Sequence, residues 1–470
     1  MQAVIPRPPL PPGPFLVVGL ARSGVAAAVA LRARGEAVVG CDAGAIGDAA
    51  RQELEAAGVA VHAPSEGVEL VSGVRTVVKS PGVPHEAPVV VAARAAGLPV
   101  VGELEIGWRL LDNEFLAVTG SNGKTTTVEL IGHVHRKAGL LVTVAGNVGT
   151  PLTALAGTLP PDETVVCEAS SFQLEDTEAF APEAAVLLNL AEDHLDRHGT
   201  FEAYRDAKLQ IFARQPPDGV AVVSRDLGIE SLGGSARRVT FGAGAGADLC
   251  QRDGRLVWRG TPLMDVDELR LRGPHNLENA MAAAAVCLAR GVEPEAVRAG
   301  LGDFAGVPHR LEEVATTGGV LYVNDSKATN VASAVVGLAS FVGGVHAILG
   351  GRGKGGDYRP LAAALAERGR AAYLIGETEA ELRRALEPTG VPLHDCGDLE
   401  HAVHAAARAA RPGEVVLLSP ASASYDQYRS FEERGEHFRA LVATLGGPPR
   451  RPPAPGRPAA AREGSRVGEP

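Results

Sequence analysis

Cysteine is scarce in this chain of 470 residues, which has five, widely spaced, at positions 41, 167, 250, 287 and 396. An odd number without a C-x-x-C pair argues against a disulfide framework and against a cysteine zinc site. Long apolar runs are also missing, because none approaches the ~20 residues that a membrane span requires. The start, MQAVIPRPPLPPGPF, has too many prolines for a secretion signal. We therefore expect a reduced, cytoplasmic setting and no membrane partner.

Lysine is scarce too. Six of the 45 basic residues are lysine, at positions 79, 124, 137, 208, 327 and 354, so the remaining basic residues are arginine. The net charge of −11 argues against a nucleic-acid partner, which would need a basic patch or stripe. An anionic small molecule is still possible, since a few local basic groups and backbone amides can bind it. The lysines that remain therefore deserve a chemical explanation.

A strand, a glycine turn and a helix follow one another three times along the chain. The run FLVVGL (15–20) is typical of a buried strand, and an alanine-rich helix follows its turn. EFLAVTGSNGKTTT (114–127) repeats this order, and a third start follows VPHRLE (307–312). Alternating strands and helices are typical of doubly wound parallel sheets. The fold class that we predict is α/β, in three domains.

The predicted domains follow these three starts. Residues 1–102 form a Rossmann-like domain, and residues 307–446 form a second one. Residues 103–306 form a central mononucleotide-binding domain with a phosphate loop and a parallel sheet. Residues 447–470 are rich in Pro, Gly and Arg, which predicts a disordered tail.

The stretch TGSNGKTTT (119–127) has the composition of a phosphate loop between a strand and a helix. Gly120 and Gly123 let the backbone wrap a phosphate, Lys124 can reach its terminal oxygens, and Thr125 can place a hydroxyl on Mg²⁺. The loop is shorter than the common G-x-x-x-x-G-K-[ST] pattern, since position 118 is valine. A plain glycine turn is the alternative, but the full set of residues favours phosphate binding.

The first glycine turn, GLARSG (19–24), is a weaker signal. Ala21 stands where a dinucleotide fingerprint has its second glycine, while Asp42 lies where an acidic residue could bind a ribose. These residues favour a second nucleotide-type ligand, and a tight turn without a ligand is the alternative.

Polar residues follow two predicted strands of the central domain. Glu168 ends one strand, and a group just past the next consists of Asn189, Glu192, Asp193, His194 and Asp196. Mg²⁺ prefers oxygen ligands, which makes Glu168 a candidate ligand. His194 is a softer donor, and alone such a residue is more often a structural hydrogen-bonding group.

Lys208 lies on the apolar face of the predicted helix FEAYRDAKLQIF (201–212). Its stem could pack inward while its head reaches solvent or pairs with Glu168 or Asp193. Alternatively, a desolvated lysine loses its proton more easily, and its neutral amine can add CO₂ to become a carbamate. Such a carbamate is an anionic oxygen ligand beside Mg²⁺ that an arginine could not form. Both readings stay open at this point.

Ordered motifs along the chain resemble the Mur ligases, the ATP-dependent amide-forming enzymes of bacterial cell-wall precursor synthesis. The resemblance runs from about Phe15 to Leu445, and no single motif decides it. It rests on TGSNGKTTT, CEASSFQLE (167–175), NLAEDHLDRHG (189–199), YRDAKLQIF, GPHNLENA, VPHRLE, NDSKATN (324–330) and GGRGKGGDY (350–358). The stretch LLSPASASYDQYRSFEERG (417–435) is similar to the branch that adds D-glutamate to UDP-N-acetylmuramoyl-L-alanine.

The resemblance implies a role for each matching residue. Lys124, His194 and Lys208 would be catalytic, and the ligands of two Mg²⁺ sites would be Thr125, Glu168, His194 and a carbamylated Lys208. The ATP site would contain Gly120, Ser121, Asn122, Gly123, Lys124, Thr125, Thr126, Asn276, Asn279, Arg310, Asp325 and Lys327. The UDP-substrate site would contain Gly19, Arg22, Ser23, Gly24, Asp42, Ser80, Gly82 and Asn147. D-Glutamate would meet Thr329, Lys354, Ser424 and Phe431.

The chain departs from the family pattern at two positions. Arg352 stands where an acidic residue is common in this branch, and Tyr425 replaces a more usual aliphatic residue beside Ser424. The first change affects the expected conformation of the loop around Arg352, and the second affects the expected fit around D-glutamate.

Other functions remain open from the sequence. They include another Mur ligase branch, a folylpolyglutamate synthase, a regulatory ATPase that forms no bond, and an NAD-dependent dehydrogenase. The third domain has no DNP motif, which argues against the diamino-acid branch. The family also implies a monomer that acts on small molecules.

Overall fold

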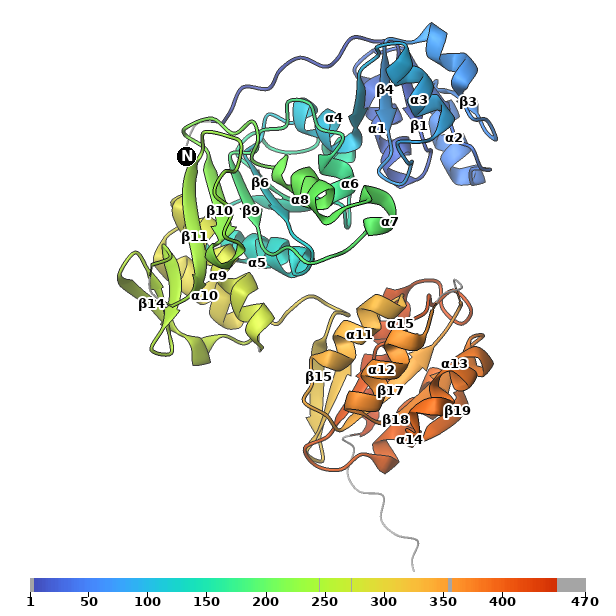
Figure 1. The fold of residues 1–470 in the computed structure, drawn as a ribbon, viewed down its shortest axis with the longest axis vertical. Helices are drawn as coiled ribbons and strands as arrows, with labels where there is room; N and C mark the ends of the chain where they lie inside the picture. The colour runs from blue at the N-terminus through green and yellow to red at the C-terminus, as the bar shows by residue number, and fades with distance from the viewer. Residues whose placement is uncertain (1–3, 245, 272, 354–356, 446–470) are drawn as a thin grey trace, which may run out of the picture. The chain divides into compact units, whose positions relative to one another are not determined.

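The computed structural model describes residues 4–244, 246–271, 273–353 and 357–445, which form two compact units. The first unit ends at Val307 and the second begins at Pro308. The first unit contains two sheets and the second contains one, and helices cover the sheets (Figure 1). Lys354 and the tail predicted to be disordered lie outside the described residues.

The first unit begins with a five-stranded parallel sheet in the order β3-β2-β1-β4-β5. Each residue of its central strand, FLVV, is buried, as the continuous apolar run predicts. The strands are β1 (Phe15–Val18), β2 (Val38–Cys41), β3 (Ala60–His62), β4 (Thr76–Lys79) and β5 (Val100–Gly102), and the helices are α1 (Arg22–Ala33), α2 (Asp48–Ala56) and α3 (Pro88–Ala95).

Helix α4 (Glu103–Leu110) packs against both sheets of the first unit. Ile106 and Leu110 belong to the core of the first sheet, whereas Leu104 and Trp108 belong to a core of the second. The predicted domain boundary at residue 102 therefore falls at the start of a helix that both cores share.

The second sheet of this unit has nine strands in the order β14-β13-β12-β11-β10-β9-β6-β8-β7. It is parallel from β7 to β12 and ends in the antiparallel meander β12–β14. The strands are β6 (Phe115–Thr119), β7 (Val142–Gly146), β8 (Thr164–Glu168), β9 (Ala184–Leu187), β10 (Val220–Ser224), β11 (Arg237–Ala243), β12 (Leu249–Arg252), β13 (Arg255–Trp258) and β14 (Thr261–Asp265).

Six helices accompany this sheet. Helix α5 packs closely on α9 and α10, and their apolar side chains share one core with one face of the sheet. The helices are α5 (Lys124–Lys137), α6 (Ser171–Leu174), α7 (Leu195–His198), α8 (Phe201–Leu209), α9 (Pro274–Ala289) and α10 (Pro294–Asp303).

The second unit holds a six-stranded sheet in the order β15-β16-β20-β17-β18-β19, in which only the edge strand β15 is antiparallel to its neighbour. The strands are β15 (Glu312–Thr317), β16 (Val320–Asn324), β17 (Val345–Gly350), β18 (Gly369–Ile375), β19 (Leu393–Gly397) and β20 (Val415–Leu418). The helices are α11 (Val331–Ala339), α12 (Arg359–Arg368), α13 (Glu379–Leu386), α14 (Leu399–Ala409) and α15 (Phe431–Leu445), and they appear in orange to red in Figure 1.

The predicted α/β class with three mainly parallel sheets is confirmed. The five cysteines are unpaired, and four of them are buried. Among the described helices, none is long and apolar enough to span a bilayer.

Candidate active site

The phosphate loop connects β6 to α5, as its sequence predicts. Gly123 has φ +83°, and a Cβ there would lie 2.1 Å from Oδ1 of Asn279. Lys124 Nζ donates to the carbonyls of Gly120 and Ser121, at 2.9 and 3.0 Å. The backbone at Gly123 therefore needs both the conformation and the small size of glycine.

Helix α9 supplies the two predicted asparagines. Asn279 is buried, and its Oδ1 accepts a long hydrogen bond from Thr127 Oγ1 at 3.4 Å. Its Nδ2 donates to Oδ1 of Asn276, also at 3.4 Å. The structure thus places Asn276 and Asn279 beside the loop, although they lie about 150 residues further along the chain.

Glu168 ends β8 beside the phosphate loop, and it is 2% exposed. One carboxylate oxygen accepts a hydrogen bond from Thr125 Oγ1 at 2.8 Å, and the other accepts one from Asn147 Nδ2 at 2.9 Å. A buried carboxylate beside a threonine hydroxyl is an oxygen donor set that fits Mg²⁺. Thr125 and Glu168 could therefore hold a divalent cation next to a bound phosphate.

Lys208 lies on the inner face of α8, where only 2% of it is exposed. Its Nζ donates to the Gly120 carbonyl at 2.9 Å and lies 4.6 Å from the centre of the Tyr204 ring. Burial and, to a smaller extent, the neighbouring charge of Lys124 lower the pKa of Lys208 to about 7, against the opposing effect of Asp193 and Glu168. The neutral amine is thus accessible near physiological pH.

Tyr204 fixes α8 to the phosphate loop. Its hydroxyl shares a hydrogen bond of 2.8 Å with Ser121 Oγ, which also accepts from the Ala191 amide at 2.9 Å. Asn122 donates from its backbone to Oδ1 of Asn189 at 2.9 Å. The segment that follows β9 and the inner face of α8 therefore both contact the loop.

His194 has a different environment from the other predicted metal ligands. It has φ +52° and a half-exposed side chain, and its Nε2 lies 3.5 Å from Asp193. Its ring packs against Phe172, with 4.7 Å between the centroids. The structure brings Thr125, Glu168 and Lys208 to the loop, and it places His194 against Asp193 and Phe172.

A pocket of about 380 Å³ lies at the carboxyl ends of β1 and β4. Of the eight residues predicted for the UDP-substrate site, seven line it: Gly19, Arg22, Ser23, Asp42, Ser80, Gly82 and Asn147. The eighth, Gly24, has a structural place instead, because a Cβ there would lie 1.9 Å from the Gly19 carbonyl oxygen. Ala21, Pro81, Val83 and Gln173 complete the lining and were not predicted from the sequence.

Polar contacts shape the floor of this pocket. Asp42 accepts hydrogen bonds from the amides of Leu20 and Gly44, at 2.7 and 2.9 Å, and Ser80 Oγ donates to the Gly19 carbonyl at 2.7 Å. Gln173 forms a capping box with Ser170 at the start of α6. The S-x-x-Q spacing was the sequence signal that could have identified Gln173.

In the second unit, Asp325 lies just past the end of β16 and is 5% exposed. Its carboxylate accepts from Ser419 Oγ at 2.7 Å and from the Leu311 amide at 3.2 Å. Burial raises the pKa of Asp325 to about 6 against the effect of these hydrogen bonds. Its carboxylate is therefore already engaged by the protein in this structure.

Among the other predicted residues of this unit, Lys327 and Thr329 follow β16 and Ser424 follows β20, while Arg310 precedes β15 and Phe431 begins α15. Lys327 Nζ lies 6.0 Å from the centre of the Phe431 ring, and Ser424 is buried. Arg310 and Thr329 are both half-buried. Ser326 and Arg434, which connect these loops, were missed by the sequence analysis. The only signal in the sequence for Arg434 was that an arginine occupies the inner face of a helix.

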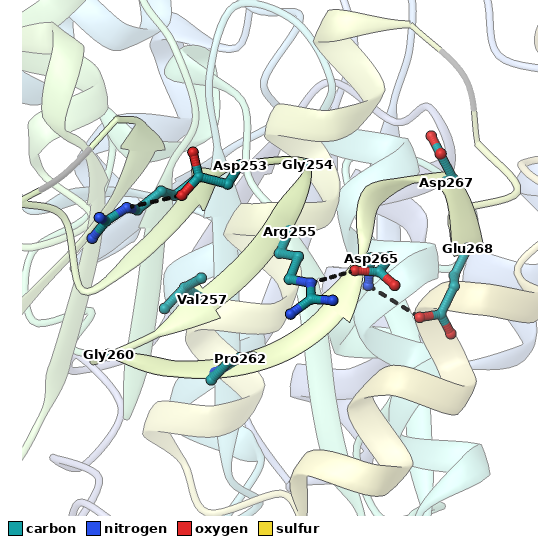
Figure 2. A pocket seen from close by; sticks show the side chains of 10 residues that line it. Asp253, Gly254, Arg255, Val257, Gly260, Pro262, Asp265, Asp267 and Glu268 are labelled. Carbon is teal, nitrogen blue, oxygen red and sulfur yellow. Dashed lines mark hydrogen bonds and ion pairs between the residues drawn. The ribbon is translucent and has the colours of Figure 1, made fainter.

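A second pocket, of about 770 Å³, lies on the β12–β14 meander (Figure 2). Its charged groups pair with each other, since Arg255 Nε lies 2.7 Å from Asp265 and the Asp265 amide donates to Glu268 at 3.0 Å. None of the predicted site residues lines it. We therefore assign it no chemistry.

Comparison with known proteins places the chain in a family. The Mur ligase middle domain matches residues 118–287, and the Mur ligase glutamate ligase domain matches residues 309–422. A UDP-N-acetylmuramoylalanine–D-glutamate ligase of Acidobacterium capsulatum is 43% identical over 91% of this chain and 95% of its own. One of Anaeromyxobacter dehalogenans is 44% identical over 91% and 96%.

Solved structures are similar in fold. The UDP-N-acetylmuramate-alanine ligase MurC of Thermotoga maritima has a TM-score of 0.55 at 19% identity, covering 92% of this chain and 99% of its own. The MurF ligase of Thermotoga maritima, solved with ADP, has a TM-score of 0.53 at 19% identity, covering 87% and 95%. Together with the sequence identities, these matches show that the chain belongs to the Mur ligase family, within the branch of the UDP-N-acetylmuramoylalanine–D-glutamate ligases.

Proposed function

We propose that this chain joins D-glutamate to UDP-N-acetylmuramoyl-L-alanine with the energy of ATP, in the synthesis of peptidoglycan precursors. The observation that carries the proposal is the identity of 43–44% over 91% of the chain to ligases with that name. The phosphate loop, the pocket at Gly19 and Asp42, and the buried Lys208 support it.

The reaction has two steps. The terminal carboxylate of the alanyl residue attacks the γ-phosphorus of ATP, which gives an acyl phosphate and ADP. The amine of D-glutamate then attacks the acyl carbon, loses a proton, and expels phosphate from the tetrahedral intermediate. Charge on the transferring phosphoryl group builds up at its oxygens, so cationic groups and backbone amides stabilise both steps.

The phosphate loop binds the ATP phosphates. In the structure, Lys124 Nζ binds the carbonyls of Gly120 and Ser121, which keeps its ammonium group over the loop. We place Gly120, Ser121, Asn122, Gly123 and Thr126 around the phosphates, and Asn276 and Asn279 towards the nucleoside. From the second unit, we assign Arg310, Asp325 and Lys327 to ATP as well.

Two Mg²⁺ sites complete the proposal. Thr125 would hold the first with the phosphates, and Glu168, His194 and Lys208 would serve the second. Bound Mg²⁺ neutralises phosphate charge during transfer. The Thr125–Glu168 hydrogen bond supports two adjacent sites, because the oxygen ligands that we assign to the first and the second cation lie 2.8 Å apart.

Lys208 enters the second site as a carbamate. Its neutral amine adds CO₂ and releases a proton, which converts a buried cation into a carboxylate-like oxygen ligand. The lowered pKa and the contact with the Gly120 carbonyl support this chemistry. Lys208→Ala should abolish phosphate release, and short carboxylic acids should restore part of it. Activity that survives the substitution without added acid would contradict the carbamate.

The pocket lined by Gly19, Arg22, Ser23, Asp42, Ser80 and Gly82 takes the UDP part of the substrate, and we assign Asn147, which also lines it, to the muramoyl part. Gly24 supports this site through its close approach to Gly19. Thr329, Lys354, Ser424 and Phe431 hold D-glutamate. The enzyme works as a cytoplasmic monomer, which light scattering of the purified protein can test.

The test is phosphate release from ATP in the presence of UDP-N-acetylmuramoyl-L-alanine. D-Glutamate should support release, while L-glutamate, D-aspartate, meso-diaminopimelate and L-lysine should not. Equal release with every amino acid, or with none, would contradict the assigned branch and acceptor. Mass spectrometry of the product then shows whether an amide to D-glutamate has formed.

A further inference from the structure

Arg434 is nearly completely buried, at 1% exposure, and it is the most buried of the described arginines. It lies in the first turn of α15, three residues after Phe431. The next residue is Gly435, where a Cβ would lie 2.1 Å from Nδ1 of His309. Helix α15 therefore packs tightly here, and the guanidinium group points into the unit rather than to solvent.

The guanidinium group joins three loops of the second unit. Its Nε donates to Ser326 Oγ at 3.0 Å, and its Nη2 donates to the carbonyls of Ser326 and Ser422, at 2.9 and 3.2 Å. Its Nη1 makes longer bonds to the carbonyls of Ala423 and Gly350, at 3.4 and 3.5 Å. These acceptors follow β16 and β20 and end β17, so one side chain holds the carboxyl ends of three neighbouring strands.

The same loops carry residues that we assign to the acceptor. Ser326 lies three positions before Thr329, between Asp325 and Lys327. Ser424 directly follows Ser422 and Ala423, whose carbonyls Arg434 binds. Ser326 Oγ also donates to the Phe431 carbonyl at 2.8 Å, which ties the start of α15 to the same group.

The charge of Arg434 is bound only by neutral groups. Its described hydrogen bonds go to four backbone carbonyls and one hydroxyl, and none of them goes to a carboxylate. Burial lowers the pKa of Arg434 to about 10, with Asp426 opposing this effect, so the group stays charged at neutral pH. A buried cation without a bonded carboxylate is costly, and a nearby anion offsets that cost.

Arginine is the side chain that suits this place. Its planar guanidinium has five N–H donors in a fixed arrangement, whereas an ammonium group has three on a single nitrogen. A lysine could keep the positive charge but could not reach carbonyls on three loops at once.

We propose that Arg434 is a positioning residue for the amino-acid acceptor. It holds the loops of Ser326, Gly350 and Ser422–Ser424 in one arrangement, and it places a positive charge beneath a site that takes a dicarboxylate. This inference rests on the proposed function, because it names the D-glutamate site as the one that Arg434 supports.

The test compares Arg434→Lys and Arg434→Met with Arg439→Met in the full-length protein. Arg439 is the matched control, since it lies on the same helix and binds Glu312 and Glu436 at the surface. For Arg434→Met we expect kcat/KM for D-glutamate to fall on the order of 10²-fold, mainly through KM, with a smaller rise in the KM for ATP because the Ser326 loop also carries Asp325 and Lys327. Arg434→Lys should recover part of the KM because it keeps the charge. Should Arg434→Met not fold, the KM of Arg434→Lys for D-glutamate carries the test.

Hydrogen exchange gives a second readout that does not depend on activity. The amides of residues 326–330 and 421–425 should exchange faster in Arg434→Met, and at the wild-type rate in Arg439→Met. Kinetics and exchange equal to those of the control would overturn the proposal. A wild-type enzyme without D-glutamate-dependent phosphate release would refute the proposed function instead, while unchanged exchange in Arg434→Met would still overturn the positioning role.

Discussion

At the scale of single residues, Lys208 shows how burial changes chemistry. Its ammonium group lies within the protein, and the Gly120 carbonyl accepts its hydrogen bond. The charge of Lys124 further disfavours protonation. A residue that would be a plain surface cation elsewhere becomes an amine that loses its proton near pH 7.

The depressed pKa of Lys208 makes stability depend on pH. The pKa is about 7 in the folded state against 10.5 for the free side chain, so the unfolded state binds more protons between these values. The contribution of Lys208 to the free energy of unfolding therefore increases as the pH rises from about 7 to about 10. Lys208→Met should raise the Tm by roughly 5 °C or more at pH 6–7, and this advantage should shrink towards pH 10. Thermal scans in CO₂-free buffer with EDTA measure the difference, and a constant difference across this range would contradict the pKa.

Gly123 and Gly139 both have a positive φ, but only Gly123 has a close neighbour at its Cβ position. Gly123→Ala meets left-handed strain of about 1–2 kcal/mol and also displaces Asn279. Gly139→Ala is the control, because it has φ +70° but nothing within 4 Å of its Cβ. Gly123→Ala should lose more stability than Gly139→Ala, and only Gly123→Ala should lower kcat/KM for ATP, by about tenfold or more. Equal ATP kinetics in the two variants would show that the contact with Asn279 does not matter.

At the scale of elements, a buried ion pair joins the first sheet to the segment after α6. Lys79, at the end of β4, lies 2.6 Å from Asp176, and both side chains are buried. Arg197, on α7, adds hydrogen bonds to the carbonyls of Pro81 and Val83, which line the pocket at Gly19 and Asp42. The geometry of this pocket therefore depends on elements from both sheets.

Lys79→Met should destabilise the protein by about 3–5 kcal/mol, because it leaves the Asp176 carboxylate buried without its cation. The double variant Lys79→Met/Asp176→Leu should regain part of this loss. Lys137→Met is the control, since its ion pair with Asp303 is exposed and contributes about 0–1 kcal/mol. Urea unfolding measures all three. Equal losses in Lys79→Met and Lys137→Met would mean that the buried pair is no more important than a surface one.

At the scale of the whole molecule, each hydrophobic core lies on one side of the boundary after Val307. The two cores of the second unit contain only residues beyond that point. In contrast, the core of the first sheet includes Ile106 and Leu110 from α4. Separate cores predict separate folding.

A fragment of residues 308–445 should therefore fold alone and unfold cooperatively, as measured by circular dichroism and two-dimensional NMR. A fragment of residues 1–102 should not, because it lacks the part of its core that α4 supplies. The matched fragment 1–111 restores α4 and should be the more structured of the two. A well-folded 1–102 would contradict the importance of this helix.

The sequence by itself determined the local features of this protein. The restarts of strand, glycine turn and helix predicted the α/β class, and the order of motifs predicted the family; both are confirmed. The phosphate loop was visible because Gly123, Lys124 and Thr125 are neighbours in sequence. Local backbone geometry and periodic burial depend on a few adjacent residues, so a sequence shows them directly.

Only the tertiary structure decided which distant residues meet. It placed Asn147 in one pocket with Gly19, and it bonded Arg434 to Ser326, which lies more than a hundred residues earlier. It also placed the ring of His194 against Phe172. These contacts depend on how whole strands and helices pack, and the free energy of that packing is spread over many side chains, so no short motif encodes it.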